Sequence, residues 1–179
     1  MKGIVFRMLL DLVEDRFGYQ MVDEIIIASN LKSKGVYTSV GTYPYSELIA
    51  LCTELEKKTG ISVEKLHLSF GEYAFNIFKQ KYSEFISEFN DIFQFLEHLD
   101  STVHVEVKKL YPEAELPSFT YKRINDKEIE LIYKSSRKLA FFAEGLIKGS
   151  LSYFQTNAET KVQPLKNDNS NVRFQIKKI

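Results

Sequence analysis

The stretch FTYKRINDKEIELIY, residues 119–133, decides the fold class because its apolar and polar side chains alternate. Such alternation is typical of half-buried β-strands, and it runs over residues 119–124 and again over residues 129–133. Further strands are predicted from Val162 onward and, after a turn-forming NDNSN, over residues 172–176. These segments predict a small, four-stranded antiparallel sheet in the second half of the chain.

Helical spacing dominates the first half of the chain. Apolar residues three and four apart predict a first helix that Gly18 ends and a second helix over residues 21–26. A third helix is predicted between Pro44 and Gly60, and Ser62 is a suitable N-cap for a fourth. We therefore expect helices to precede the sheet.

The predicted fold is α+β, in a single domain of two lobes. The N-terminal lobe is helical and covers about residues 1–60. The C-terminal lobe covers about residues 61–179 and combines the sheet with helices, including a long helix predicted over residues 139–154.

The composition limits the classes of function. The chain has 179 residues, 44% hydrophobic and 27% charged, which excludes general disorder. Twenty-four Lys and Arg residues balance 24 Asp and Glu residues, so neither nucleic acid nor an anionic membrane is expected as a partner. A single cysteine, Cys52, excludes a disulfide framework. The sequence contains neither a signal peptide nor an apolar run long enough to span a bilayer, so we expect a cytoplasmic protein.

The motif Tyr133-x-Ser135-x-Arg137 places two hydroxyls and a guanidinium at alternate positions. In an extended chain the three side chains lie on one side, with neighbours about 7 Å apart. Such an array of donors suits paired carboxylates or phosphates, and Arg supplies a bidentate fork. The alternative is a strand end whose polar groups are simply solvated.

Three histidines, His67, His98 and His104, are the candidate metal ligands. His104 lies in the sequence TVHVEV, residues 102–107, whose alternation resembles a strand. A buried imidazole there needs a polar partner, and a metal ion is one such partner. A surface or structural histidine is the alternative for each of the three. The chain contains no Gly-rich phosphate loop, no G-x-S-x-G and no H-E-x-x-H motif.

Taken together, these residues resemble the heme-nitric oxide/oxygen binding (H-NOX) family, the bacterial relatives of the heme domain of soluble guanylate cyclase. The resemblance covers essentially the whole chain. It is carried by five segments: MKGIVF (residues 1–6), His104 six residues before Leu110-Tyr111-Pro112, Leu116-Pro117, Tyr133-x-Ser135-x-Arg137, and Ala143-Glu144-Gly145-Leu146. A histidine at this distance upstream of Y-x-S-x-R is specific, whereas either part alone is weak.

The resemblance implies a heme b (iron protoporphyrin IX) between a distal helical lobe and a proximal α+β lobe. His104 would be the proximal iron ligand, on a helix. Tyr133, Ser135 and Arg137 would bind the heme propionates, and Pro117 would press on the porphyrin and distort it. The 14 Phe and 10 Tyr residues could supply apolar walls for the flat macrocycle.

The resemblance also indicates which gases bind. Residues matching the distal wall of the pocket lack hydrogen-bond donors: Val5, Leu9, Ala74, Phe78, Phe142 and Leu146. In O₂-binding members a tyrosine stands at the position of Phe142. Missing a charge-assisted hydrogen bond costs bound O₂ about 1.5–3 kcal/mol. We therefore expect a sensor that binds NO and CO and excludes O₂.

The family model of signalling starts at the proximal histidine. NO would weaken the His104–iron bond, free the helix that carries His104 and let the heme relax against Pro117. The lobes would then rotate, and a separate partner would read the change. The resemblance suggests a histidine kinase, or a cyclic-di-GMP synthase or phosphodiesterase, as that partner. The chain itself is expected not to be an enzyme.

Two other functions are open. A peroxidase-like heme enzyme would need an acid, a base or an arginine near the iron, for which His67 and Arg7 are the candidates. A cofactor-free interaction or lipid-binding module would need neither His104 nor Arg137. His98 is the rival proximal ligand, and the Leu-Tyr-Pro register favours His104.

Overall fold

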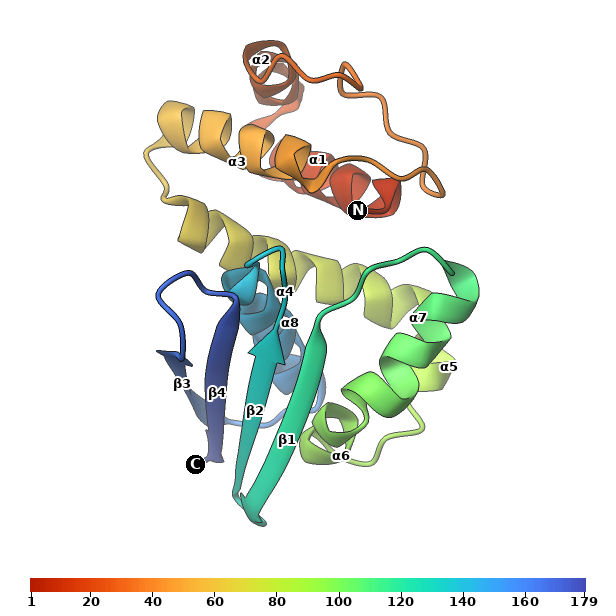
Figure 1. The fold of residues 1–179 in the computed structure, drawn as a ribbon, viewed down its shortest axis with the longest axis vertical. Coiled ribbons are helices and arrows are strands. Elements are labelled where there is room, and N and C mark those ends of the chain that lie inside the picture. Colours follow the sequence, from red (N-terminus) through yellow and green to blue (C-terminus); the bar gives the residue numbers. More distant parts are fainter.

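In the computed structural model, which describes residues 1–179, the chain folds into an upper and a lower lobe that meet at helices α4 and α8 (Figure 1). In the upper lobe α1 and α3 pack against α4, and α2 packs against α1 and α3. Their bounds are α1 Gly3–Phe17, α2 Tyr19–Ala28, α3 Tyr45–Thr59 and α4 Val63–Lys81. No helix of the chain is long and apolar enough to cross a bilayer.

The predicted ends of these helices are confirmed. Gly18 ends α1 with φ 83°, and Gly60 caps α3 in the left-handed region, at φ 72°, which glycine adopts without a Cβ penalty. The Ser62 side chain accepts a hydrogen bond from the Lys65 amide at the start of α4. Two of these boundaries are thus set by glycines at positive φ, and the third by a side chain that caps the helix N-terminus.

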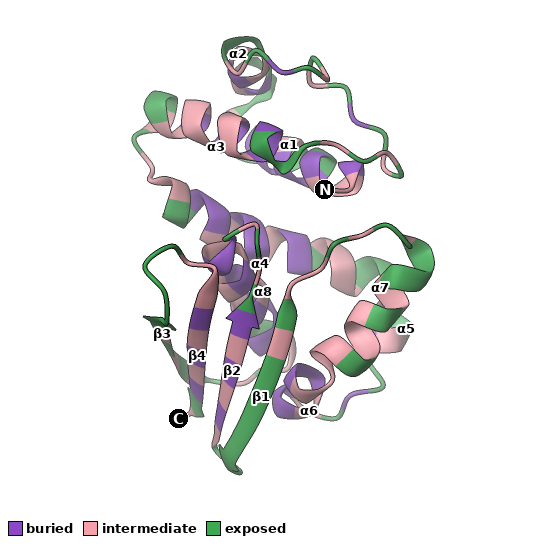
Figure 2. Ribbon diagram, in the orientation of Figure 1, coloured by how far each residue is buried: buried purple, intermediate pink, exposed green.

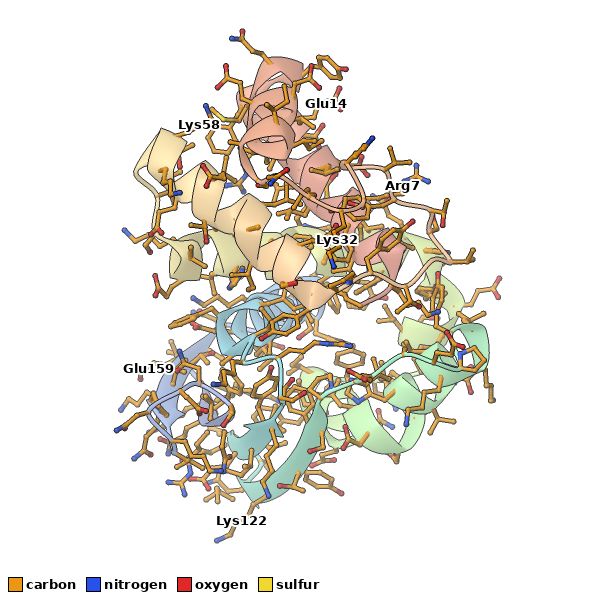
Figure 3. All side chains as sticks on the ribbon, turned by 45° about the horizontal axis from the view of Figure 1, so that its top comes forward. Arg7, Glu14, Lys32, Lys58, Lys122 and Glu159 are labelled. Carbon is orange, nitrogen blue, oxygen red and sulfur yellow. The ribbon has the colours of Figure 1, made fainter.

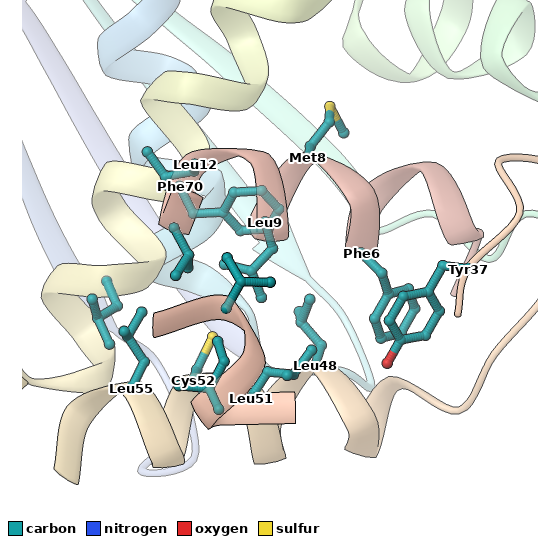
Figure 4. Packing of buried hydrophobic residues seen from close by; sticks show 14 of the residues in the cluster. Phe6, Met8, Leu9, Leu12, Tyr37, Leu48, Leu51, Cys52, Leu55 and Phe70 are labelled. Carbon is teal, nitrogen blue, oxygen red and sulfur yellow. The ribbon is translucent and has the colours of Figure 1, made fainter. Parts of the chain in front are cut away.

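The core of the upper lobe lies between α1, α3 and α4 (Figure 4). Leu9 and Leu51 are buried there, and the Phe6 ring stacks on Tyr37 with centroids 4.4 Å apart. Burying side chains of this size contributes about 1.5–3 kcal/mol each, so the lobe is held mainly by this cluster.

The lower lobe contains the remaining elements. Their bounds are α5 Ser83–Ile86, α6 Ile92–Glu97, the π-helix η1 Leu99–Val103, α7 His104–Leu110, β1 Ser118–Asn125, β2 Glu128–Lys134, α8 Ala140–Tyr153, β3 Ala158–Pro164 and β4 Asn171–Lys178. The chain is therefore α+β, as predicted, with the helical lobe preceding the sheet (Figure 1).

The four strands form an antiparallel sheet in the order β1-β2-β4-β3. Burial alternates along β2 and β4, and β1 is mostly exposed (Figure 2). The buried face of the sheet packs against α8. It is formed by Ile129, Leu131, Tyr133, Val172, Phe174 and Ile176.

One strand boundary differs from the prediction. β3 begins at Ala158, four residues before Val162. Its first residues pair with β4 through their backbones, Ala158 opposite Lys178 and Thr160 opposite Ile176. No run of apolar side chains marks this edge strand, so periodicity underestimates its length.

Helices α4 and α8 approach closely at two glycines. A Cβ atom added to Gly71 would lie 2.2 Å from the Phe142 carbonyl oxygen, and one added to Gly145 would lie 2.1 Å from that of Leu68. The absence of side chains at both positions lets the backbones approach. Because α4 belongs to the core of the upper lobe and α8 packs on the sheet, this contact joins the lobes.

Candidate functional site

His104 is the first residue of α7 and directly follows the π-helix η1. The strand suggested by the alternation over residues 102–107 is therefore wrong, and the helical placement implied by the family resemblance is confirmed. Short π-helical segments often occur at functional sites. Here TVHVEV spans the end of η1, which lies beside β1, and the start of α7; Val105 is exposed and the other five residues are partly buried.

The imidazole of His104 is held by a carboxylate. Its Nδ1 lies 2.8 Å from Oδ1 of Asp100, and Oδ2 of Asp100 accepts a hydrogen bond from the Phe119 amide at 2.9 Å. Desolvation on burial lowers the pKa of His104, although Asp100 opposes this, so the neutral ring is favoured. With Nδ1–H donated to Asp100, the lone pair on Nε2 is free to bind a metal.

Asp100 was not among the residues predicted from the sequence. The signal that could have revealed it is its position, four residues before His104, which places the two side chains on one face of a helical segment. That signal is weak in a sequence region that looks like a strand.

The other two histidines have different surroundings. Nδ1 of His98 lies 2.8 Å from the Gln94 carbonyl oxygen, and the ring packs on Phe89. His67 lies in α4 with 5% of its surface exposed, and its Nε2 has no hydrogen-bond partner. Of the three, His104 alone is oriented by a carboxylate.

Arg7, the other candidate for acid–base chemistry, lies at the surface. Its side chain extends from α1 at the edge of the upper lobe and donates to Ser39 Oγ at 3.3 Å (Figure 3). An exposed guanidinium on this side of α1 is not placed to act inside a pocket.

The Tyr133-x-Ser135-x-Arg137 motif lies where β2 meets α8. The extended geometry predicted for it is wrong, because β2 ends at Lys134 and a turn follows. Ser135 Oγ accepts a hydrogen bond from the Arg137 amide, and the Tyr133 hydroxyl accepts one from the Leu139 amide. The chain turns here because β2 ends at Lys134 and α8 begins at Ala140, only three residues after Arg137.

The three side chains of the motif are still close together. Burial raises the pKa of Tyr133, and the Ser135 side chain and the charge of Arg137 both act in the opposite direction. The turn is braced from the β3–β4 loop, since the Ser135 amide donates to the Ser170 carbonyl at 2.9 Å. A phenol, a hydroxyl and a guanidinium thus converge at one end of the sheet.

Arg137 is mostly buried, and both terminal nitrogens of its guanidinium are bound to Glu115. Nη1 donates to the Glu115 carbonyl oxygen at 2.6 Å and Nη2 to the Glu115 carboxylate at 2.8 Å. Only 17% of the Arg137 side chain is exposed, against 79% for Glu115. Glu115 was not predicted as a site residue, and nothing in the sequence marks a contact across 22 positions. It precedes Leu116 and the half-buried Pro117, in the segment between α7 and β1.

The residues predicted for the distal wall come from three helices around the contact between the lobes. Each belongs to the core cluster of the upper lobe or packs against it, and Leu146 also contacts the cluster of the lower lobe. The Phe142 ring lies 4.8 Å from that of Phe70. The wall consists of Val5 and Leu9 from α1, Ala74 and Phe78 from α4, and Phe142 and Leu146 from α8.

The chemistry of these residues fits a heme. No three His, Cys, Asp or Glu side chains are grouped to hold a metal ion. A single imidazole with a free Nε2 suits an iron whose other ligands come from a macrocycle. Hydroxyl and guanidinium donors at Tyr133, Ser135 and Arg137 suit its acid side chains. Apolar side chains from α1, α4 and α8 suit its flat faces.

Known proteins are similar to this chain in sequence and fold. The family described as Haem-NO-binding matches residues 2–162. An H-NOX protein from K. algicida, solved in the unliganded Fe(II) state, is 40% identical, with a TM-score of 0.96 over 100% of this chain and 97% of that one. An H-NOX from Shewanella woodyi, bound to IWP-051 in the Fe(II)CO state, is 39% identical, with a TM-score of 0.85 over 100% and 95% of the two chains.

A more distant structure has the same fold. An H-NOX protein from S. oneidensis in the Fe(II)NO state is 27% identical, with a TM-score of 0.92 over 100% of this chain and 99% of that one. No curated protein matches the sequence.

Proposed function

The chain belongs to the Haem-NO-binding (H-NOX) family of heme-based gas sensor domains, and on this premise we propose that it senses NO and CO, excludes O₂ and regulates a separate signalling protein. The observation that carries the proposal is the His104 imidazole, which Asp100 orients through Nδ1 so that Nε2 can serve as a ligand.

The residues that would bind the iron and the propionates of a heme b lie in the lower lobe, and the distal wall comes from α1, α4 and α8. His104 would be the one protein ligand of the iron, and Tyr133, Ser135 and Arg137 would bind the propionates. A bound heme supplies the iron at which a diatomic gas binds. Pro117 lies between the helix of His104 and the strand β1, where the family resemblance places a proline that presses on the porphyrin.

Selectivity among gases would follow from the distal wall. NO and CO bind ferrous heme without help from the protein, whereas O₂ gains from a hydrogen-bond donor because it becomes partly negative. Phe142 and Leu146 offer no donor, and neither do the wall residues of α1 and α4. Excluding a donor therefore disfavours O₂ by about 1.5–3 kcal/mol.

The hydrogen bonds of Asp100 give a route from His104 to the rest of the lower lobe. Asp100 binds both the imidazole and the Phe119 amide of β1, so a displacement of His104 changes the contact between the start of α7 and the sheet. Beyond α7, Glu113 reaches Lys2 of the upper lobe, with Nζ and Oε2 3.5 Å apart. Movement of α7 would therefore alter how the lobes meet.

The partner would bind one arrangement of the lobes better than the other, since without such a difference in affinity nothing is signalled. The family resemblance suggests a histidine kinase, or an enzyme that makes or degrades cyclic-di-GMP. The sequence carries no catalytic motif of its own.

Absorption spectra test the proposal. Protein purified from heme-replete cells should show a ferrous Soret band that shifts with NO and with CO and stays unchanged in air-saturated buffer on the timescale of mixing. His104→Gly should lose the histidine-ligated spectrum and regain it with free imidazole. A colourless wild-type protein, or an unchanged five-coordinate spectrum in His104→Gly, would overturn the proposal.

A further inference from the structure

The fork of Arg137 is already bound to a carboxylate of the chain itself, and from this we infer that Glu115 is a built-in competitor for the heme propionate. The inference rests on the proposed function, in which Arg137 binds a propionate. Tyr133, Ser135 and Arg137 would slow the loss of heme, whereas Glu115 would speed it. The Glu115 carboxylate binds the Arg137 guanidinium, which a propionate would otherwise bind.

The geometry of the pair resembles carboxylate recognition by arginine. The two terminal nitrogens of Arg137 reach two oxygens of one residue, at 2.6 Å to the Glu115 carbonyl and 2.8 Å to its carboxylate. A bidentate fork of this kind is what a propionate would also use. The Glu115 carboxylate therefore occupies a donor that a propionate needs.

The two contacts of Glu115 differ in how easily they can be given up. The carbonyl contact belongs to the backbone of the segment between α7 and β1. The carboxylate belongs to a side chain that is 79% exposed, so the carboxylate itself can turn into water and be solvated there. Arg137 is only 17% exposed and would need a new anion in its place. An incoming propionate supplies that anion.

Glu113 provides a comparison within the same segment. It lies two residues earlier, is also mostly exposed and pairs with Lys2 at 3.5 Å, without contacting Arg137. Removing its charge takes one negative charge from the same segment and leaves the contacts of Arg137 with Glu115 in place. Glu113→Gln is therefore the matched control for Glu115→Gln.

The test measures loss of heme from the heme-bound chain to an excess of apomyoglobin. Glu115→Gln keeps the backbone contact and removes the competing charge, so heme should leave about two- to fivefold more slowly than from the wild type, the range for an exposed ion pair. Glu113→Gln should change the rate by less than Glu115→Gln does. In an Arg137→Ala background, Glu115→Gln should have no further effect.

A second cofactor separates competition from general electrostatics. Heme dimethyl ester has no free carboxylates, so its rate of loss should be the same from the wild type and from Glu115→Gln. Faster loss of heme from Glu115→Gln would overturn the inference, because Glu115 would then support Arg137 rather than compete with the propionate. An equal slowing by Glu113→Gln, or with the dimethyl ester, would overturn it as well.

The outcome for Arg137 itself distinguishes this inference from the proposed function. If Arg137→Ala loses heme no faster than the wild type, the propionate site of the proposed function fails. If Arg137→Ala loses heme faster while Glu115→Gln does not slow the loss, the inference alone fails.

Discussion

His104 donates from Nδ1 to Asp100 at 2.8 Å, and the second oxygen of the same carboxylate accepts the Phe119 amide at 2.9 Å. One residue thus fixes the tautomer of the candidate iron ligand and links it to the start of β1. Such carboxylate–histidine pairs raise the basicity of the ligating nitrogen and set the orientation of its ring. The site therefore depends on a residue that would not itself touch the cofactor.

Substituting Asp100 should weaken heme binding without removing the ligand. Loss of an outer-shell partner of this kind costs about 10–100-fold in metal affinity, and we expect Asp100→Ala to release heme faster by that order. Asp100→Asn keeps a carbonyl acceptor for Nδ1–H and should lie between the wild type and Asp100→Ala. Heme transfer to apomyoglobin measures all three rates. Equal rates for wild type and Asp100→Ala would mean that the hydrogen bond does not support the ligand.

Adding a donor to the distal wall should change gas selectivity. Phe142→Tyr places a hydroxyl on α8, in the wall where the present ring packs on Phe70. Ferrous Phe142→Tyr should bind O₂ about 10–100-fold more tightly than the wild type, as expected for one charge-assisted hydrogen bond. Titration with O₂, followed at the Soret band, measures the change. Phe142→Leu is the control for altered packing, and a similar gain in that variant would contradict the role of the hydroxyl.

Much of the fold could be predicted from the sequence because local patterns carry it. Gly18, Gly60 and Ser62 set helix ends through their own backbone or side-chain chemistry. The alternation of apolar and polar residues in β2 and β4 arises because one face of the sheet is buried. The sequence predicts the start of β3 too late because its first residues pair only through the backbone, which leaves no side-chain pattern.

The site was harder to predict because its geometry depends on contacts between distant segments. The TVHVEV alternation over residues 102–107 is compatible with a strand or with a partly buried helical segment, and the structure places these residues at the end of η1 and in α7. Asp100 has a weak local signal in its position four residues before His104, whereas its contact with Phe119 and the contact of Glu115 with Arg137 join segments 19 and 22 positions apart. The resemblance to a family supplies the candidate ligand His104 and the candidate donor residues, whereas the residues that contact them, Asp100 and Glu115, are found only in the structure.

A side chain at Gly71 should strain the contact between the lobes. The Cβ of Gly71→Ala would lie 2.2 Å from the Phe142 carbonyl oxygen, so α4 and α8 would have to separate. We expect a loss of about 1–3 kcal/mol in the free energy of unfolding, the usual cost of overpacking, despite the higher helix propensity of alanine. Urea denaturation followed by circular dichroism measures it. Asn76→Ala, at an exposed position of α4, is the control and should not lower stability.

The stability of the protein should depend on pH through His67. This imidazole is 5% exposed, its Nε2 has no partner, and desolvation lowers its pKa from 6.5 to about 4. The folded state therefore keeps the ring neutral, and between pH 6.5 and about 4 the unfolded chain binds the extra proton. Stability is thus fully present above pH 6.5, falls as the pH drops through this window, and loses about 3 kcal/mol by its lower end.

Replacing His67 with a residue that does not titrate isolates this contribution from that of the carboxylates. Free energies of unfolding measured in urea between pH 4 and 7 should fall less steeply for His67→Leu and His67→Gln than for the wild type, whatever the absolute stability of each variant. The difference in slope is the decisive quantity, because both variants also change packing at a buried position. Parallel pH dependences in all three proteins would show that the ring of His67 gains a proton as readily in the folded chain as in the unfolded one.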